Sequence, residues 1–245
     1  MSYANGPRIV TDGLVCCLDA ANRKSYPGSG TTLYDLSGNG TNATLANGAS
    51  FNSSEKGYIT FNSSTSDYFS TSPGEVFYEY GTEITACAWF KRNGTISGGA
   101  GGGQSTQNVD NWSTDPATNV WLFHGNTSNT IAFYVNANNN GSYYYRSRNS
   151  SVLDNNTWYF ICGTCSSSLI KLYTNGVQDG GSATGVNSGI IVNNSNSVVQ
   201  YGKDPRYSTN RYFNGSVGQT LLYNRELSAD EILQNFNATK GRFGL

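Results

Sequence analysis

Charged residues are scarce in this chain. They make up 13% of its 245 residues, and the formal net charge is −1 at pH 7. A nucleic-acid-binding surface needs a clustered excess of Lys and Arg, which this balance does not supply. No apolar run approaches the roughly 20 residues that a membrane-spanning helix requires. The composition therefore predicts a protein that neither binds nucleic acid nor inserts into a membrane.

A secretory signal is also missing. The first residues, MSYANGPRIVTDG, contain no basic region followed by an apolar one. We therefore expect synthesis in the cytoplasm without a signal peptide. In that setting, the odd number of cysteines and their apolar surroundings predict free, buried thiols rather than disulfides. The prediction applies to all five cysteines: Cys16, Cys17, Cys87, Cys162 and Cys165.

The residues for two common kinds of hydrolase are lacking as well. His124 is the only histidine, so a Ser-His or Cys-His nucleophile would depend on it alone. A glycosidase needs two carboxylates about 5–10 Å apart, and the chain contains no E-x-D-x-x-E string that would supply them from one strand. Glu75, Glu79 and Glu83 are spaced by four in an irregular segment. The sequence therefore predicts no enzyme and no catalytic residues.

What the chain has in abundance is strand formers, with Gly and Asn between them. Asn175-Gly176 is a strong hairpin signal, because a type I′ turn needs positive φ at both central residues. We see no internal repeat and no linker. The pattern predicts one all-β domain over residues 1–245, an antiparallel two-sheet jelly-roll sandwich. Strands are expected at residues 14–20, 84–91, 120–123, 131–135, 142–147, 158–165, 169–174 and 217–223.

One helix is expected, near residues 229–237. Ser228 and Glu231 form an S-x-x-E capping box, in which each side chain satisfies a free backbone N–H of the first turn. Leu227 and Ile232 are placed to act as a hydrophobic staple across the cap. The chain should therefore end as strand, tight connection and short amphipathic helix.

Several segments together resemble laminin G-like domains of the concanavalin A-like superfamily. The last one, RYFNGSVGQTLLYNRELSADEI, is similar to the family pattern that ends Y-N-R-A-L-S-x-x-E-I. The resemblance implies a lectin-like jelly roll and covers nearly the whole chain. Because the family shares a fold and not an activity, it implies no reaction. The other matching segments are YDLSGNGTNATLANGASF (34–51), YITFNSSTSDYF (58–69), ITACAWFKRNG (84–94) and TWYFICGTCSSSLIKLYTNGVQ (157–178).

Two long polar loops, at 97–119 and 202–214, interrupt the strands, and loops of this kind commonly carry binding sites. Carbohydrate recognition pairs an aromatic ring with amides, acids or Arg. The same rings could instead anchor their own loops or meet a neighbouring subunit. The candidate carbohydrate-binding or interface residues are Asp110, Asn111 and Trp112 in the first loop, and Arg206, Tyr207, Arg211 and Tyr212 in the second.

The resemblance also makes calcium a candidate ligand, since many laminin G-like domains bind this ion through oxygen atoms of their loops. Asp35, Asn39 and Asp67 match turn positions where the family has acids or amides. Asx turns that satisfy local backbone N–H groups explain the same residues. The chain departs from the family at Asn62, Gly218 and Gln219, where acids are usual. We therefore predict no cofactor, with calcium at these three residues as the alternative.

Two further strings, LDAANRKSYPGSGTTLYDLSGNG (18–40) and the ending NATKGRFGL, resemble laminin G-like proteins of tailed, especially marine, bacteriophages. The resemblance implies a non-enzymatic structural protein on the virion surface: a capsid decoration, a tail fibre or an adhesin that binds host-surface glycans. Its partners would be other virion proteins or those glycans, and homo-oligomerisation is left open. The alternatives are a glycoside hydrolase of the same fold and an architectural subunit without a ligand.

Overall fold

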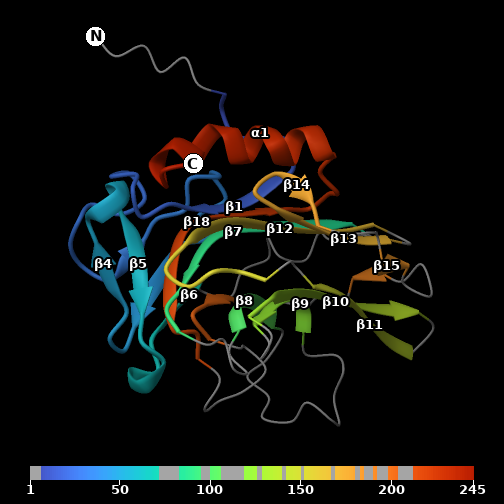
Figure 1. Cartoon of the computed structure of the whole chain (residues 1–245), viewed down its shortest axis with the longest axis horizontal. Coiled ribbons are helices and arrows are strands. Elements are labelled where there is room, and N and C mark those ends of the chain that lie inside the picture. Colours follow the sequence, from blue (N-terminus) through green and yellow to red (C-terminus); the bar gives the residue numbers. More distant parts are fainter. Residues whose placement is uncertain are drawn as a thin grey trace.

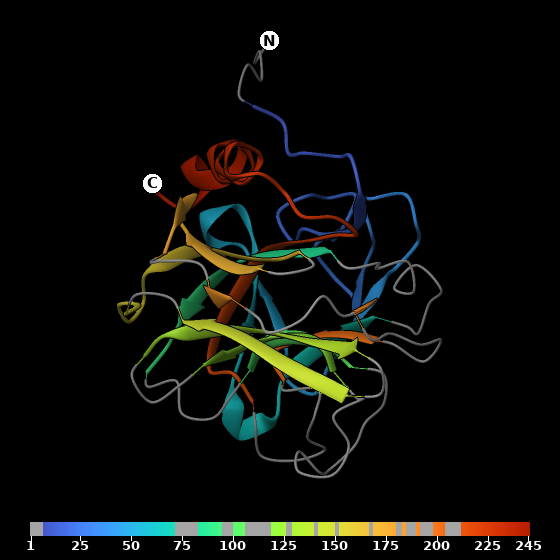
Figure 2. The same ribbon diagram turned by 90° about the vertical axis from the view of Figure 1, so that its right-hand side faces the viewer.

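The computed structural model consists of two facing antiparallel β-sheets and a helix that covers one of them (Figure 1). The α-helix, α1 (Ala229–Thr239), lies across the outer side of the upper sheet, and the second sheet lies on the other side of that sheet (Figure 2). The structure describes residues 7–71, 83–94, 100–105, 119–125, 129–139, 142–149, 152–166, 169–179, 183–184, 190–191, 198–203 and 212–245.

The sheet beneath the helix is called sheet A. It contains β1 (Leu14–Leu18), β4 (Ser50–Asn52), β5 (Tyr58–Phe61), β7 (Ile84–Arg92), β12 (Trp158–Cys165), β13 (Leu169–Thr174), β14 (Val177–Gln178), β15 (Ala183–Thr184) and β18 (Gly215–Tyr223). The strand order is β14-β13-β12-β7-β18-β5-β4, with β1 also paired to β18 and β15 to β13.

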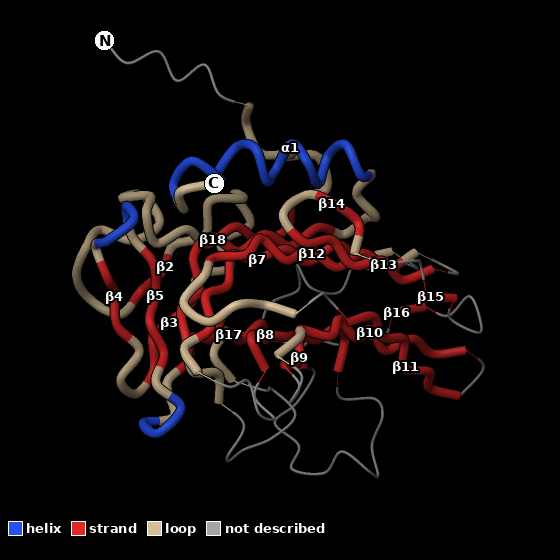
Figure 3. The backbone as a smooth tube through the Cα atoms, viewed as in Figure 1, coloured by secondary structure: helices blue, strands red, loops and turns tan. Residues whose placement is uncertain are grey.

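The opposite sheet is called sheet B. It contains β2 (Thr32–Leu33), β3 (Ala43–Ala46), β6 (Tyr68–Thr71), β8 (Ala100–Ser105), β9 (Asn119–Gly125), β10 (Ile131–Asn139), β11 (Ser142–Asn149), β16 (Ile190–Ile191) and β17 (Val198–Tyr201). The order is β11-β10-β9-β8-β17-β6-β3-β2, with β16 paired to β10. Short 3-10 turns at Ser54–Lys56, Ser63–Thr65 and Lys240–Arg242 lie outside the two layers of strands (Figure 3).

Sheet A is buried on both faces, and β7 shows how the sequence achieves this. Ala86 and Phe90 face the core between the two sheets, as the alternation predicted. Cys87 and Trp89 face a second core beneath α1. A strand covered on both sides is expected to read as a nearly continuous apolar run, and Ile84–Phe90 does, with Thr85 as the one polar residue. No helix in the described part of the chain is long and apolar enough to cross a membrane.

The helix prediction is confirmed, and α1 runs two residues past the expected end. The Ser228 side chain accepts a hydrogen bond from the Glu231 N–H, and Glu231 accepts one from the Ser228 N–H. Leu227 and Ile232 are both buried in the second core, as a staple requires. The Asn175-Gly176 turn also has the predicted positive φ angles, 53° and 80°. These local signals depend on neighbours in sequence, which is why they could be read without the fold.

Two sequence predictions are wrong at particular residues. The first loop was expected over 97–119, but Ala100–Ser105 forms β8, held by β9 on one side and β17 on the other. Glycine disfavours strands, yet pairing on both edges outweighs that preference.

The second error concerns the cysteines, of which all five were predicted to be free. Cys87 and Cys162 form a disulfide between β7 and β12. The strand register places them directly opposite one another, with Cα atoms 4.0 Å apart, although 75 residues separate them in sequence. Cys16 and Cys17 are free and buried, and they face different cores, as neighbours in a strand should. Burial raises the pKa of the Cys16 thiol to about 12.

Candidate functional site

A polar corner lies on the outer face of sheet B, where β6 and β17 pair. Phe69 and Tyr201 point into the core between the sheets and are almost fully buried. Because side chains alternate along a strand, Tyr68, Ser70 and Gln200 lie on the opposite, outer face. The register pairs Gln200 with Ser70, so their side chains are neighbours across the two strands.

Lys203 completes this corner just beyond the end of β17. Its Nζ lies 5.3 Å from the centre of the Tyr68 ring and 6.0 Å from the centre of the Tyr212 ring. The side chain is only 7% exposed, and the backbones of Lys203 and Tyr212 form an isolated β-bridge. A cation placed over two tyrosine faces is stabilised by their ring quadrupoles. The arrangement fixes two aromatic rings and one ammonium group at the base of the second long loop.

The chain can make this corner because Gly202 precedes the lysine. Gly202 has φ = +90°, and a Cβ there would come within 2.8 Å of the Asp67 carbonyl oxygen and the Phe61 ring. The Phe213 N–H donates to the Gly202 carbonyl at 2.8 Å, which closes the base of the loop. A residue with a side chain would therefore displace β6 from β17 and open the corner.

One of the predicted carbohydrate-binding or interface residues, Tyr212, lies in this corner. Asp110, Asn111, Trp112, Arg206, Tyr207 and Arg211 lie outside the described residues. Sequence reasoning missed Tyr68, Lys203 and Gln200. Tyr68 and Lys203 are 135 positions apart, and only the pairing of β6 with β17 brings them together. No local pattern in the sequence contains that pairing.

The candidate calcium ligands are engaged in loop structure. The Asp35 carboxylate accepts hydrogen bonds from the N–H of Cys17 (2.8 Å) and from the N–H and hydroxyl groups of Ser37 and Thr41. Burial would raise the pKa of Asp35, but the hydrogen bonds from Ser37 and Cys17, with the others, lower it below its ordinary value. Its oxygens thus already have donors, as an Asx turn predicts.

The other two candidates behave similarly. The Asn39 amide donates to the Val15 carbonyl at 3.2 Å, and the Asp67 carboxylate accepts from the N–H groups of Gly48 and Asn62. Within the described ranges, no group of three or more His, Cys, Asp or Glu side chains is arranged to hold a metal. Calcium binding stays a prediction that the contacts of these three residues do not test.

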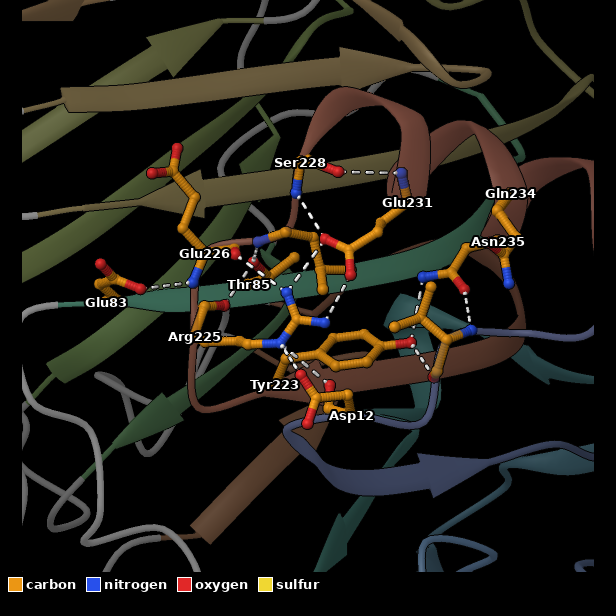
Figure 4. A network of polar contacts seen from close by, with 12 residues as sticks. Asp12, Glu83, Thr85, Tyr223, Arg225, Glu226, Ser228, Glu231, Gln234 and Asn235 are labelled. Carbon is orange, nitrogen blue, oxygen red and sulfur yellow. Dashed lines mark hydrogen bonds and ion pairs between the residues drawn. The ribbon is translucent and has the colours of Figure 1, made fainter.

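The Asn-Arg-Glu-Leu-Ser segment, which carries the family resemblance most clearly, fastens the C-terminal helix to sheet A (Figure 4). Thr85 on β7 bonds to both sides of the connection: its hydroxyl donates to the Arg225 carbonyl and accepts from the Leu227 N–H. The Glu226 carboxylate accepts from Lys171 at 2.9 Å and from Thr164 at 3.2 Å. This motif is structural: its polar groups position the helix.

The same network holds the N-terminal segment through its main chain. Gln234 donates to the Arg8 carbonyl at 2.7 Å, and the Val10 N–H donates to the Asn235 side-chain oxygen at 2.8 Å. The Tyr223 hydroxyl donates to the Val10 carbonyl at 2.9 Å. Residues 8–10 are therefore tied to α1 and β18 chiefly through their backbone atoms. Figure 4 shows the Tyr223 and Asn235 side chains, which make the two bonds to Val10.

Comparisons with known proteins agree with this architecture. The family model Laminin_G_3, described as the concanavalin A-like lectin/glucanases superfamily, matches residues 62–233. No curated protein matches the chain.

Solved structures of botulinum neurotoxins and of Paraclostridial Mosquitocidal Protein 1 share the fold. One solved structure concerns the cell entry of botulinum neurotoxin type C, which is dependent upon interaction with two ganglioside molecules. It matches this chain with a TM-score of 0.67 and 18% sequence identity, and the match covers 94% of this chain and 52% of that one. The binding domain of botulinum neurotoxin DC in complex with rat synaptotagmin II has a TM-score of 0.66 and 17% identity, with coverages of 94% and 52%. The binding domain of Paraclostridial Mosquitocidal Protein 1 has a TM-score of 0.63 and 17% sequence identity, and the match covers 93% of this chain and 52% of that one.

The chain spans about half the length of each of these three solved chains. At such low identity, the likeness shows a shared fold and says nothing of a shared ligand.

Proposed function

Because the chain belongs to the concanavalin A-like lectin/glucanases superfamily, we propose that it is a non-enzymatic carbohydrate-binding protein of a virion surface. In this proposal the outer face of sheet B is the binding face. The partners are host-surface glycans and the virion proteins that hold the chain on the particle.

The observation that carries the proposal is the corner formed by Tyr68, Lys203 and Tyr212. A sugar packs its C–H face on an aromatic ring and directs its hydroxyl groups to fixed polar groups. The corner brings two rings, an ammonium group and the neighbouring Gln200 amide together on one face. The corner lies at the base of the Arg- and Tyr-rich loop over 202–214, which the sequence proposed as a binding segment.

The solved structures support binding in general terms. Those named above are described as binding domains or by their dependence on gangliosides, so the same architecture serves recognition there. Since this chain corresponds to about half of each one, neither gangliosides nor synaptotagmin are assigned to it. The proposal names carbohydrate as a class and leaves the sugar to experiment.

The contacts of four acidic residues in the described part of the chain support a non-enzymatic role. A glycosidase needs one carboxyl group with a raised pKa beside a second carboxylate. Glu226 is paired with Lys171, and Glu83 accepts the N–H of Glu226. The pKa values of Asp35 and Glu231 are both lowered, which is the wrong direction for a general acid.

The virion location is supported by the two strings, at 18–40 and at the C-terminus, that resemble bacteriophage laminin G-like proteins. A decoration protein, a tail fibre and an adhesin would all present a binding face outward from the particle. Localising the chain by cryo-electron microscopy of an intact particle would test this part separately from sugar binding.

Binding is tested with the purified full chain on a glycan array, followed by calorimetry with the strongest arrayed glycan. Tyr212→Ala should weaken that binding at least tenfold, because truncating a central aromatic contact costs ~2 kcal/mol or more. Tyr34→Ala is the matched control, since Tyr34 is 46% exposed and is not part of the corner.

A blank array for the wild-type protein would reject carbohydrate binding and favour an architectural subunit. Release of reducing sugar from an arrayed glycan would instead favour the glycoside hydrolase. Equal binding by Tyr212→Ala and the wild type would move the site away from this corner.

A further inference from the structure

Gln200 has an unusual position in the candidate site. Its side chain lies on the outer face of sheet B but is only 5% exposed. Its amide nitrogen donates to the Ser70 hydroxyl oxygen at 3.3 Å. Its amide oxygen, Oε1, is buried and has no hydrogen-bond partner.

The orientation of this amide is fixed by Ser70. The Ser70 hydroxyl donates its hydrogen to the Thr71 carbonyl at 3.1 Å, so toward Gln200 it presents a lone pair. Only the amide NH₂ can meet that lone pair, because a carbonyl oxygen there would face another acceptor. The carbonyl oxygen of Gln200 must therefore point to the other side, where it lacks a donor.

An unsatisfied buried carbonyl lowers the stability of the folded protein. An apolar side chain of similar shape at position 200 would avoid that cost. Natural sequences keep such local conflicts mainly at functional sites. Gln200 lies directly beside the strand that carries Tyr68, so the conflict falls within the proposed binding face.

We propose that Gln200 is a specificity-determining residue whose Oε1 accepts a hydrogen bond from a hydroxyl group of the bound carbohydrate. This inference rests on the proposed function and adds the chemistry of the group that is recognised. A carboxylate, sulfate or phosphate has no hydrogen to donate to an amide oxygen, so none of these groups occupies this position. Because Oε1 is buried, a single sugar hydroxyl reaches it only when the side chains above it move aside on binding.

The test uses Gln200→Met, which keeps an unbranched side chain and removes the acceptor. Binding of the strongest arrayed glycan is measured by calorimetry, and unfolding is followed by circular dichroism. We expect affinity to fall about tenfold or more, because one hydrogen bond is lost. The melting temperature should stay level or rise, because a buried unpaired oxygen is gone. Gln178→Met, at an exposed position on β14 of sheet A, should leave the affinity for the glycan unchanged.

A direct structural measurement keeps the inference testable if Gln200→Met does not fold. A crystal structure of the wild-type complex should place a sugar hydroxyl oxygen within about 3.2 Å of Oε1.

Each contrary outcome has a definite meaning. Equal glycan affinity of the wild-type protein and Gln200→Met would overturn this inference and leave the proposed function intact. A crystal structure of the complex in which only a water molecule contacts Oε1 would overturn it as well. A marked fall of the melting temperature in Gln200→Met would also overturn it, because Gln200 would then be a structural residue. A wild-type protein that binds no arrayed glycan would overturn both.

Discussion

The guanidinium group of Arg225 lies against the carboxylate of Glu231 with two hydrogen bonds, from Nη2 to Oε1 at 2.6 Å and from Nη1 to Oε2 at 3.0 Å. Glu231 is also the third residue of α1, where it accepts the Ser228 N–H. One carboxylate therefore closes the capping box and ties the helix to the end of β18. Paired forks of this kind are among the stronger ion contacts in proteins.

This contact predicts a stability change in acid. The hydrogen bond from Arg225, with smaller contributions that include the Ser228 N–H, lowers the pKa of Glu231 to about 2. A carboxyl group whose pKa is lowered by folding stabilises the protein above its unfolded pKa, and this stabilisation is lost as pH falls through the folded value. We expect the melting temperature to fall between about pH 4.5 and pH 2. In Glu231→Gln this part of the fall should be absent, and an identical pH profile in both proteins would contradict the assignment.

The Asp35 carboxylate predicts both a mutational effect and a response to metal removal. Asp35→Ala removes acceptors from the N–H groups of Cys17, Ser37 and Thr41, and should cost about 2–3 kcal/mol of unfolding free energy. Denaturation with urea measures this. Asp154→Ala is the control, because Asp154 is exposed and its carboxylate accepts from the Tyr159 hydroxyl at 3.2 Å, a contact that water can replace.

Chelation gives the second readout for Asp35. Because its oxygens are held by protein donors, EDTA should leave the melting temperature of the wild type unchanged. A rise of several degrees on adding calcium, absent in Asp35→Ala, would instead support the calcium site predicted from the family.

A glycine in sheet A predicts sensitivity to one added methyl group. A Cβ on Gly163 of β12 would lie 2.3 Å from Cγ of Phe133, which comes from β10 of the opposite sheet. Phe133 is fully buried, so neither sheet can yield without losing contacts. Gly163→Ala should therefore destabilise the protein by ~1–3 kcal/mol in urea denaturation. Gly241→Ala, where nothing lies within 4 Å of the added atom, should stay within about 0.5 kcal/mol of the wild type.

The disulfide predicts a pattern of alkylation. In denaturant without reductant, iodoacetamide should label Cys16, Cys17 and Cys165 and leave Cys87 and Cys162 unlabelled. Mass spectrometry after prior reduction should show all five labelled. Five labels without reductant would restore the expectation of free thiols. Under native conditions labelling should be slow, because burial raises the pKa values of Cys16 and Cys17 and keeps both thiols protonated.

What the sequence could predict was set by short-range chemistry. The capping box at Ser228, the turn at Asn175-Gly176 and the alternation of β7 each involve residues within a few positions of one another, so their geometry follows from local rules. The laminin G-like segments then supplied the antiparallel two-sheet fold, which the structure and the family match confirm.

What the sequence could not predict depends on the pairing of distant strands. Ala100–Ser105 reads as a flexible loop until β9 and β17 are placed beside it. The corner of Tyr68, Lys203 and Tyr212 exists only because β6 and β17 are in register. Pairing of this kind is decided by the packing of whole sheets, and a single sequence carries no local sign of it.

The way residues 8–10 are tied to α1 has a practical consequence for measuring binding. Because Gln234, Asn235 and Tyr223 contact main-chain atoms, the exposed Arg8 side chain can be exchanged without loss of these bonds. A biotin or a fusion tag attached N-terminal to this segment would project from the side of the molecule that carries α1. Sheet A then separates the tag from the outer face of sheet B (Figure 2). Protein immobilised in this way on a sensor would display Tyr68 and Tyr212 toward the solution, whereas random coupling through exposed lysines such as Lys24 and Lys56 would hold the molecules in several orientations.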